Sequence, residues 1–73
     1  MSDEIRLSVT AAVGGREYTA EMPYPRVVWD PAGDHDREQL RLIARHRFGS
    51  WLYKETGVRL PEERLEALPV TIS

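Results

Sequence analysis

The chain has 73 residues, 41% of them hydrophobic and 30% charged, with ten Lys and Arg against twelve Asp and Glu and a net charge of -2. This length bounds the chain to one small domain, residues 1–73, and the absence of Cys excludes disulfides, thiolate zinc sites and cysteine nucleophiles. No apolar run approaches the roughly 20 residues of a membrane span, and the N-terminus lacks the pattern of a secretory signal, so we expect a soluble, cytoplasmic protein.

Two stretches near the N-terminus alternate apolar and polar residues, which is typical of half-buried strands. The odd positions are apolar over Ile5–Val13, and the even positions are apolar over Tyr18–Tyr24. Gly14-Gly15 between them suits a two-residue turn, because glycine accepts positive φ at both positions. We predict an antiparallel hairpin, with Pro23 and Pro25 ending the second strand or confining it to a sheet edge.

The next apolar stretch is Arg26–Trp29, which is rich in β-branched and aromatic residues. Such residues favour strands. We therefore predict a third short strand here, before Asp30-Pro31 and Gly33 turn the chain.

A long helix is predicted over residues 36–56. Asp36 lies three residues before Gln39, the spacing of a capping box, and Gly57 supplies the stop signal. The residues expected on its buried face recur at spacings of three and four: Leu40, Ile43, Ala44, Phe48, Trp51 and Leu52.

The C-terminal part contains two shorter predicted elements. Pro61 is suited to the first turn of a short helix through Ala67, and the segment 69–72 reads as extended, so it is able to return to the sheet as a last strand. The predicted fold class is α+β: a small antiparallel sheet packed on one long amphipathic helix, in the order β-β-(β)-α-(β).

Carboxylates gather just before and inside the start of the long helix. Asp30, Asp34, Asp36 and Glu38 are oxygen ligands that a hard cation accepts. Their spacing does not fit a calcium loop, because position twelve counted from Asp30 is Arg41, where a bidentate Glu is required. We assign these acids to turns and to the helix start and predict no metal and no cofactor, while cation binding by Asp30, Asp34 and Asp36 stays open.

His46 and Ser50 stand four apart on the predicted helix, so a serine activated by a histidine is conceivable. The Gly-x-Ser-x-Gly turn that presents such a serine is missing, because Gly49-Ser50-Trp51 has no preceding Gly at the required position. A domain of this size also rarely encloses a pocket of the ~300 Å³ at which small-molecule sites begin. We predict that the protein is not an enzyme.

Arg37, Arg41 and Arg45 are spaced by four and so form a ladder along one side of the predicted helix. Residues 37–54 hold five Lys and Arg against one acid, Glu38, in an otherwise acidic chain. The ladder is suited to an acidic protein surface or to nucleic-acid phosphates. It is equally compatible with a solvated face on which Glu38 and other acids neutralise the arginines.

Leu42 and Tyr53 fall outside the apolar face of the helix, and exposed Tyr, Leu and Arg together are typical of a protein interface. They are equally compatible with covering the flank of the sheet. Gly49 in mid-helix costs about 1 kcal/mol relative to Ala and indicates close approach of another backbone, either that of the sheet of this domain or that of a neighbouring molecule.

The order of a hairpin, a third strand and a helix resembles HicB-like antitoxins over about forty positions, through Gly14, Gly15, Tyr18 and Pro25. The Pro-Asp-Leu-Pro-Gly turn of that family is missing, so no function or site residue is carried over from it.

We expect a non-catalytic protein-protein interaction module, an accessory or inhibitor protein that binds a larger partner or itself. The expected partner-binding residues are Arg37, Arg41, Leu42, Arg45 and Tyr53. The alternative is a nucleic-acid-binding protein that uses the Arg37, Arg41 and Arg45 face.

Overall fold

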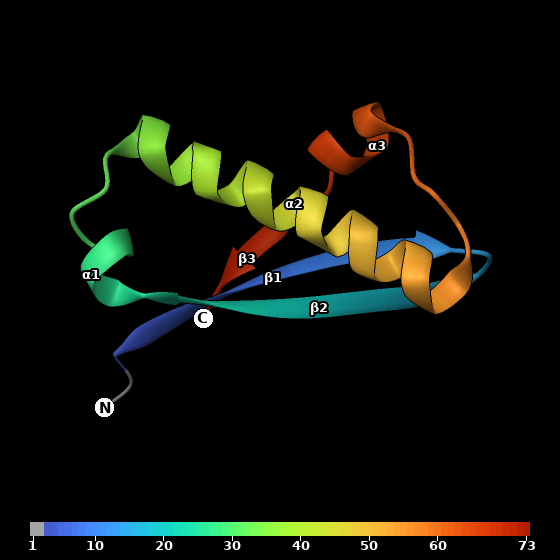
Figure 1. The fold of residues 1–73 in the computed structure, drawn as a ribbon, viewed down its shortest axis with the longest axis horizontal. Coiled ribbons are helices and arrows are strands. Elements are labelled where there is room, and N and C mark those ends of the chain that lie inside the picture. Colours follow the sequence, from blue (N-terminus) through green and yellow to red (C-terminus); the bar gives the residue numbers. More distant parts are fainter. Residues whose placement is uncertain (1–2) are drawn as a thin grey trace.

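A three-stranded antiparallel sheet forms one layer of the computed structural model, and helices form the other layer (Figure 1). The structure describes residues 3–73, so the first two residues of the predicted domain lie outside the described part. The elements in chain order are β1 (Glu4–Val13), β2 (Arg16–Pro25), α1 (Arg26–Trp29), α2 (Asp34–Thr56), α3 (Glu62–Glu66) and β3 (Val70–Ile72). The sheet order is β2-β1-β3, and the predicted α+β fold class is confirmed.

The hairpin forms as predicted from the glycine pair. Gly14 and Gly15 have φ of 59° and 79°, which permits a turn whose twist matches that of the strands. The pairing runs without a bulge from Val13 opposite Arg16 to Glu4 opposite Pro25. The alternating pattern therefore places one face of β1 wholly inside the protein, since its odd positions from 5 to 11 are buried.

The two prolines of β2 sit where a missing donor costs no hydrogen bond. Because Val13 and Arg16 close a two-residue hairpin, the even-numbered residues of β2 bond to β1 and the odd-numbered residues direct their backbone groups to the open edge. Pro23 and Pro25 are both odd-numbered, and β2 is an edge strand. The expectation that these prolines mark a sheet edge is confirmed.

The predicted strand at residues 26–29 is wrong, because these residues form the short helix α1. In the described part of the chain, the pairing of β1 with β2 ends at Glu4 opposite Pro25. The chain turns instead, and the Asp30 amide donates to the Arg26 carbonyl at 2.8 Å. The turn directs Trp29 into the core, where it is 5% exposed, and leaves Val27 82% exposed.

The long helix α2 crosses one face of the sheet and ends as predicted (Figure 1). Gly57 has φ of 75°, and its amide donates to the Tyr53 carbonyl at 2.8 Å. The start differs, since the N-cap is Gly33 without a side-chain cap bond and Asp36 lies inside the first turn. Asp36 therefore complements the positive end of the helix dipole and does not form the predicted capping box.

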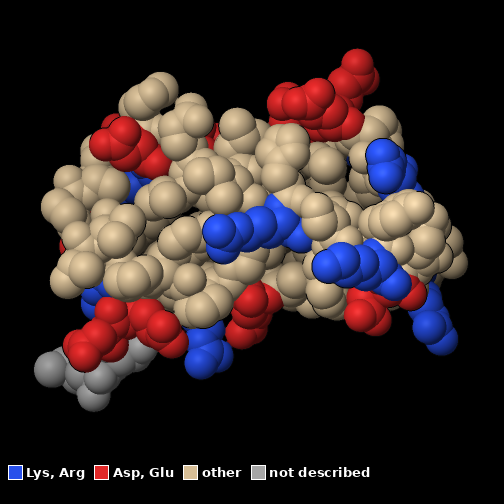
Figure 2. Space-filling model, in the orientation of Figure 1, with Lys and Arg blue, Asp and Glu red and all other residues tan. Residues whose placement is uncertain are grey.

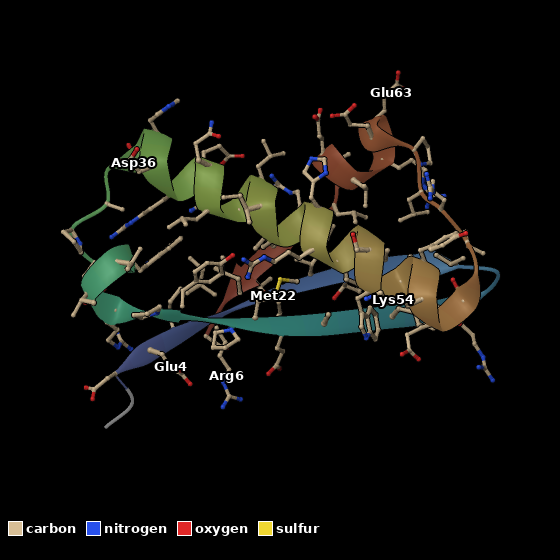
Figure 3. The ribbon with its side chains drawn as sticks, viewed as in Figure 1. Glu4, Arg6, Met22, Asp36, Lys54 and Glu63 are labelled. Atoms are coloured by element: carbon tan, nitrogen blue, oxygen red, sulfur yellow. The ribbon has the colours of Figure 1, made fainter. Side chains whose placement is uncertain are left out.

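The core lies between α2 and the sheet. Its buried apolar side chains are Ile5, Leu7, Val9, Ala11, Trp29, Ala44, Phe48, Leu52, Leu60 and Leu68. Met22, which is partly buried, packs against this core from β2, beneath α2 (Figure 3). The placement of Ile43 on the buried face is wrong: Ile43 is 45% exposed, because it lies ~100° around the helix from fully buried Ala44.

The short helix and the last strand of the C-terminal part form as predicted. α3 follows Pro61, whose carbonyl accepts from the Arg64 and Leu65 amides, and Leu60 and Leu68 bury their side chains on either side of it. β3 pairs with β1, with Val70 opposite Val9, which confirms the last strand. In the part of the chain that the structure describes, no helix is long and apolar enough to cross a membrane.

Candidate protein-binding surface

Arg37, the first residue of the predicted ladder, is used inside the protein. Its guanidinium donates to the carbonyl of Trp29 at 3.3 Å and to that of Asp30 at 3.2 Å. These carbonyls end α1, and basic side chains commonly satisfy free carbonyls at a helix C-terminus. Arg37 therefore joins the start of α2 to the end of α1.

The ring of Trp29 is a further contact of the arginine ladder. The guanidinium carbons of Arg37 and Arg41 lie 5.0 and 5.6 Å from the centre of its ring. Cations at such distances from an indole face are attracted to it by about 0.5–1 kcal/mol at exposed sites and more where water is excluded. Arg37 and Arg41 therefore help to fix the position of Trp29, which was predicted to lie in a third strand.

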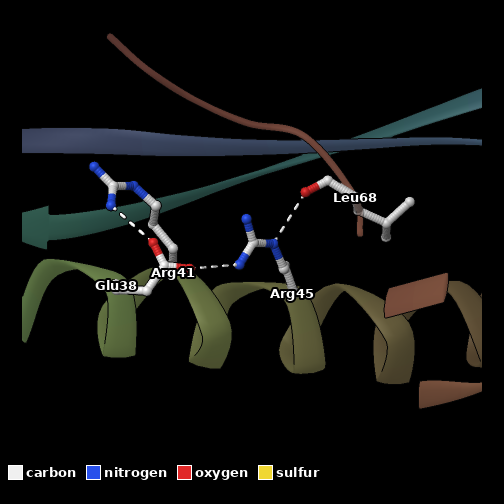
Figure 4. A network of polar contacts seen from close by, with 4 residues as sticks. All are labelled: Glu38, Arg41, Arg45 and Leu68. Carbon is white, nitrogen blue, oxygen red and sulfur yellow. Dashed lines mark hydrogen bonds and ion pairs between the residues drawn. The ribbon is translucent and has the colours of Figure 1, made fainter. Parts of the chain in front are cut away.

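Glu38 neutralises the remaining two arginines of the ladder, as Figure 4 shows. Its carboxylate accepts from Arg41 at 3.1 Å and from Arg45 at 3.2 Å, and Arg45 also donates from Nε to the Leu68 carbonyl at 3.0 Å. The hydrogen bond from Arg45, followed by that from Arg41, lowers the pKa of Glu38 from its usual value. The side chain of Arg45 is only 13% exposed.

The other two predicted contact residues lie differently. Leu42 is half-buried and Tyr53 is 46% exposed, and the guanidinium of Arg59 stacks 4.9 Å from the Tyr53 ring. Ile43 lines a shallow depression on α2 together with Leu42, His46, Arg47 and Ser50. We call the outward-facing residues Leu42, Ile43, His46, Arg47, Ser50 and Tyr53 the outer face of α2.

The outer face of α2 combines apolar side chains with unpaired positive charge. Within residues 3–73, the side chain of Arg47 has no ion-pair or hydrogen-bond partner, in contrast to the three arginines of the ladder. The same holds for the side chain of Lys54, which follows Tyr53 on α2 beside this face. Figure 2 shows the side of the molecule on which α2 lies: acidic side chains gather at its margins, and basic ones lie across a largely uncharged middle. Sequence reasoning missed Ile43 and Arg47, because Ile43 fits the spacing of the buried residues and Arg47 falls outside the ladder.

The carboxylates at the start of α2 do not converge. Asp30 forms an ion pair with Arg26 at 4.0 Å, and Asp34 and Asp36 occupy the first turn of the helix. Among the described residues, the single group of three side chains placed to share a metal ion lies elsewhere, at His46, Glu62 and Glu66.

A groove of about 640 Å³ runs between the second half of α2 and the segment that contains α3. Gly49 lines this groove on α2, and the side chain of Leu65 packs directly over it. Gly49 therefore marks a close approach, but the element that approaches is α3, through the Leu65 side chain, and not the backbone of the sheet. His46 and Ser50 both line the groove, but no hydrogen bond joins them in the described part of the chain. The groove therefore shows no activated serine.

Comparison with protein-family models, with curated proteins and with solved structures gives no match.

Proposed function

We propose that the protein is a non-catalytic, cytoplasmic protein-binding module that acts as an accessory or inhibitor protein by covering a surface of a larger partner or by self-association. The observation that carries the proposal is the outer face of α2. Ile43 and Tyr53, 45% and 46% exposed, lie on the same helix as Arg47, whose side chain has no ion-pair or hydrogen-bond partner among residues 3–73. Tyr, Arg and large apolar residues are the types that supply most of the energy of protein interfaces.

The chemistry of this face defines the partner that fits it. Ile43 and Leu42 require an apolar centre on the partner, because their burial is favourable by roughly 25 cal/mol for each Å² removed from water. Arg47 and Lys54 require acidic residues around that centre, since they have no carboxylate of their own within the described chain. The proposed partner therefore presents an apolar patch with a negatively charged rim.

Arg37, Arg41 and Arg45 enter the proposal as flanking residues. They hold α2 against α1 and Leu68 and so fix the outer face of α2, while Leu42 and Tyr53 contact the partner directly. The nucleic-acid alternative requires these three guanidinium groups to face phosphates. Each of them instead has internal partners, so this alternative stays a prediction without a structural observation in its favour.

Charge reversal at Arg47 tests the proposal without disturbing the internal network. We expect the Arg47→Glu variant, combined with Ile43→Ser, to lose at least about tenfold in affinity for the partner, the equivalent of ~1.4 kcal/mol. The matched control is Glu17→Lys, which changes charge on the opposite side of the sheet, where Glu17 is exposed. Capture of partners by tagged wild-type and variant proteins measures the difference.

Self-association is separated by measuring the mass of the purified protein in solution. A dimer that the Arg47→Glu variant abolishes supports the self-association form of the proposal. A partner that the double variant captures as well as the wild type does contradicts the proposal in either form.

A further inference from the structure

Three side chains with metal-binding atoms converge where α3 docks on α2. His46 comes from α2, Glu62 and Glu66 come from α3, and one ligand atom of each lies within 4.8 Å of the others. The two glutamates are four residues apart, so they project from the same side of α3. All three side chains are exposed and are open to an ion from solvent.

The docking of α3 is specific, so the convergence is built into the fold. A Cβ at Gly49 would lie 2.9 Å from a terminal methyl carbon of Leu65, which shows how closely α3 approaches α2 at this point. Arg45 adds a second tie through the Leu68 carbonyl, at 3.0 Å. His46 lies between Arg45 and Gly49 in the sequence of α2. In α3, Leu65 lies between the two glutamates.

The negative charges of Glu62 and Glu66 are not balanced by ion pairs with other described residues. In the described part of the chain, neither Glu62 nor Glu66 has an ion-pair partner, whereas Glu21, Asp30 and Glu38 each pair with an arginine. Like charges four apart on a helix destabilise it. The basic side chains of the same groove lie elsewhere: Lys54 is two turns further along α2, about 12 Å from His46, and Arg59 stacks on Tyr53. A bound cation would remove this imbalance.

We propose that His46, Glu62 and Glu66 bind one divalent transition-metal ion, with Zn²⁺ the best fit, and that the ion fastens α3 to α2. An imidazole nitrogen with two carboxylates is a donor set of Zn²⁺, whereas Ca²⁺ and Mg²⁺ are bound by oxygen ligands. Ligand atoms around a tetrahedral zinc stand about 3.3 Å apart, given bonds of ~2.0–2.2 Å. Rotation of the exposed glutamate side chains closes the remaining distance from 4.8 Å.

Three protein ligands leave at least one coordination position of the ion for water or for a ligand from another protein. This site adjoins the outer face of α2, because His46 belongs to both. Metal binding is nevertheless a property of the isolated chain, so it is measurable whether or not a partner exists.

Titration of the purified, metal-free protein with Zn²⁺ tests the proposal, with calorimetry to count sites and thermal unfolding to measure stabilisation. We expect one site per chain and a melting temperature that rises with Zn²⁺, because a ligand of the native state alone stabilises it. Loss of residues that merely support a metal ligand already weakens binding by about 10- to 100-fold, so His46→Asn, Glu62→Gln and Glu66→Gln should each weaken it at least about tenfold.

The chain supplies matched controls for both ligand types. His35 is the other histidine and is exposed at the start of α2, and Glu63 lies between the two proposed ligands in sequence but points away from α2 (Figure 3). His35→Asn and Glu63→Gln should leave Zn²⁺ affinity unchanged. The proposal is overturned by the absence of saturable binding, by unchanged affinity in His46→Asn, or by Ca²⁺ or Mg²⁺ binding as tightly as Zn²⁺.

Discussion

Arg45 connects α2 with the segment that follows α3 through one guanidinium group. Its Nε donates to the Leu68 carbonyl and its terminal nitrogen donates to Glu38, while its backbone belongs to α2. Because only 13% of this side chain is exposed, a charge reversal at Arg45 would leave its partners unpaired and would perturb folding as well as binding. Arg47 is therefore the better residue at which to test binding, since the structure gives it no internal partner.

Glu38 should make the stability of the protein sensitive to acid. Its pKa is lowered in the folded protein by the hydrogen bonds from Arg45 and Arg41, so its contribution to stability is present above its unfolded pKa of 4.5 and is lost as the pH falls through the lower, folded value. The free energy of unfolding of the wild type should exceed that of Glu38→Gln near pH 7.

The two proteins should converge in stability as the pH falls through the folded pKa of Glu38, because protonated Glu38 then resembles the neutral amide. Urea unfolding across this range measures the effect, with Glu17→Gln, which changes an exposed glutamate, as the control. A constant difference between wild type and Glu38→Gln at every pH would contradict the role assigned to Glu38.

At the scale of elements, the contact of α2 with α3 depends on a missing side chain. Gly49 lowers the helix propensity of α2 by about 1 kcal/mol relative to Ala, and Leu65 occupies the space where a Cβ would stand. The nearest atoms are terminal methyl carbons of a flexible side chain, so Leu65 is able to shift. Glycine at position 49 therefore lowers the helix propensity of α2 but allows α3 to pack closely against it.

A double-mutant cycle measures how far Leu65 restricts the residue at position 49. In a Leu65→Ala background, Gly49→Ala should raise the free energy of unfolding by about 1 kcal/mol, the full gain in helix propensity. In the wild-type background the gain should be smaller, because Leu65 must move. Urea unfolding of the four proteins gives the coupling energy. Equal effects in the two backgrounds would show that Leu65 does not restrict position 49.

A helix or strand could be predicted where the residues that determine it lie close together in the sequence. The hairpin is encoded by alternation and by Gly14-Gly15, which act within ten residues, and Gly57 ends α2 through its own backbone conformation. The helix α1 could not be predicted from β-branched residues, because such residues form a strand only where another strand pairs with them. Among the described residues, the pairing of β1 with β2 ends at Glu4 opposite Pro25. Ile43 fits a helical spacing, but only the position of the sheet decides that it faces outward.

The candidate sites also depend on contacts between residues that lie far apart in the sequence. Arg37, Arg41 and Arg45 form a ladder by their spacing alone, yet their partners at Trp29, Asp30 and Leu68 are supplied by distant segments. His46 and the α3 glutamates are separated by the turn after Gly57, so no local pattern brings them together. The mid-helix Gly49 indicated a close approach at this point of the helix, but not that α3 is the element that approaches.

For the whole molecule, the two layers leave two broad surfaces of different character. The outer side of the sheet is polar, with an Arg6–Glu21 ion pair at 3.4 Å and a hydrogen bond between the hydroxyls of Thr10 and Thr19 at 2.9 Å. Arg6 points away from the helical layer in Figure 3. The outer face of α2 instead carries exposed apolar side chains and an unpaired arginine. This difference is the reason that the proposed binding surface is placed on the helical side.

Site-specific photo-crosslinking tests this assignment most directly. A photoreactive amino acid replaces Ile43 in one protein and Glu17, on the sheet side, in the other, and each is irradiated in cells. We expect a discrete crosslinked protein, either a second copy of the chain or a larger partner, from position 43 alone, and its loss when Arg47→Glu is added. Crosslinking from position 17 alone, or a product at position 43 that Arg47→Glu leaves unchanged, would contradict binding through the outer face of α2.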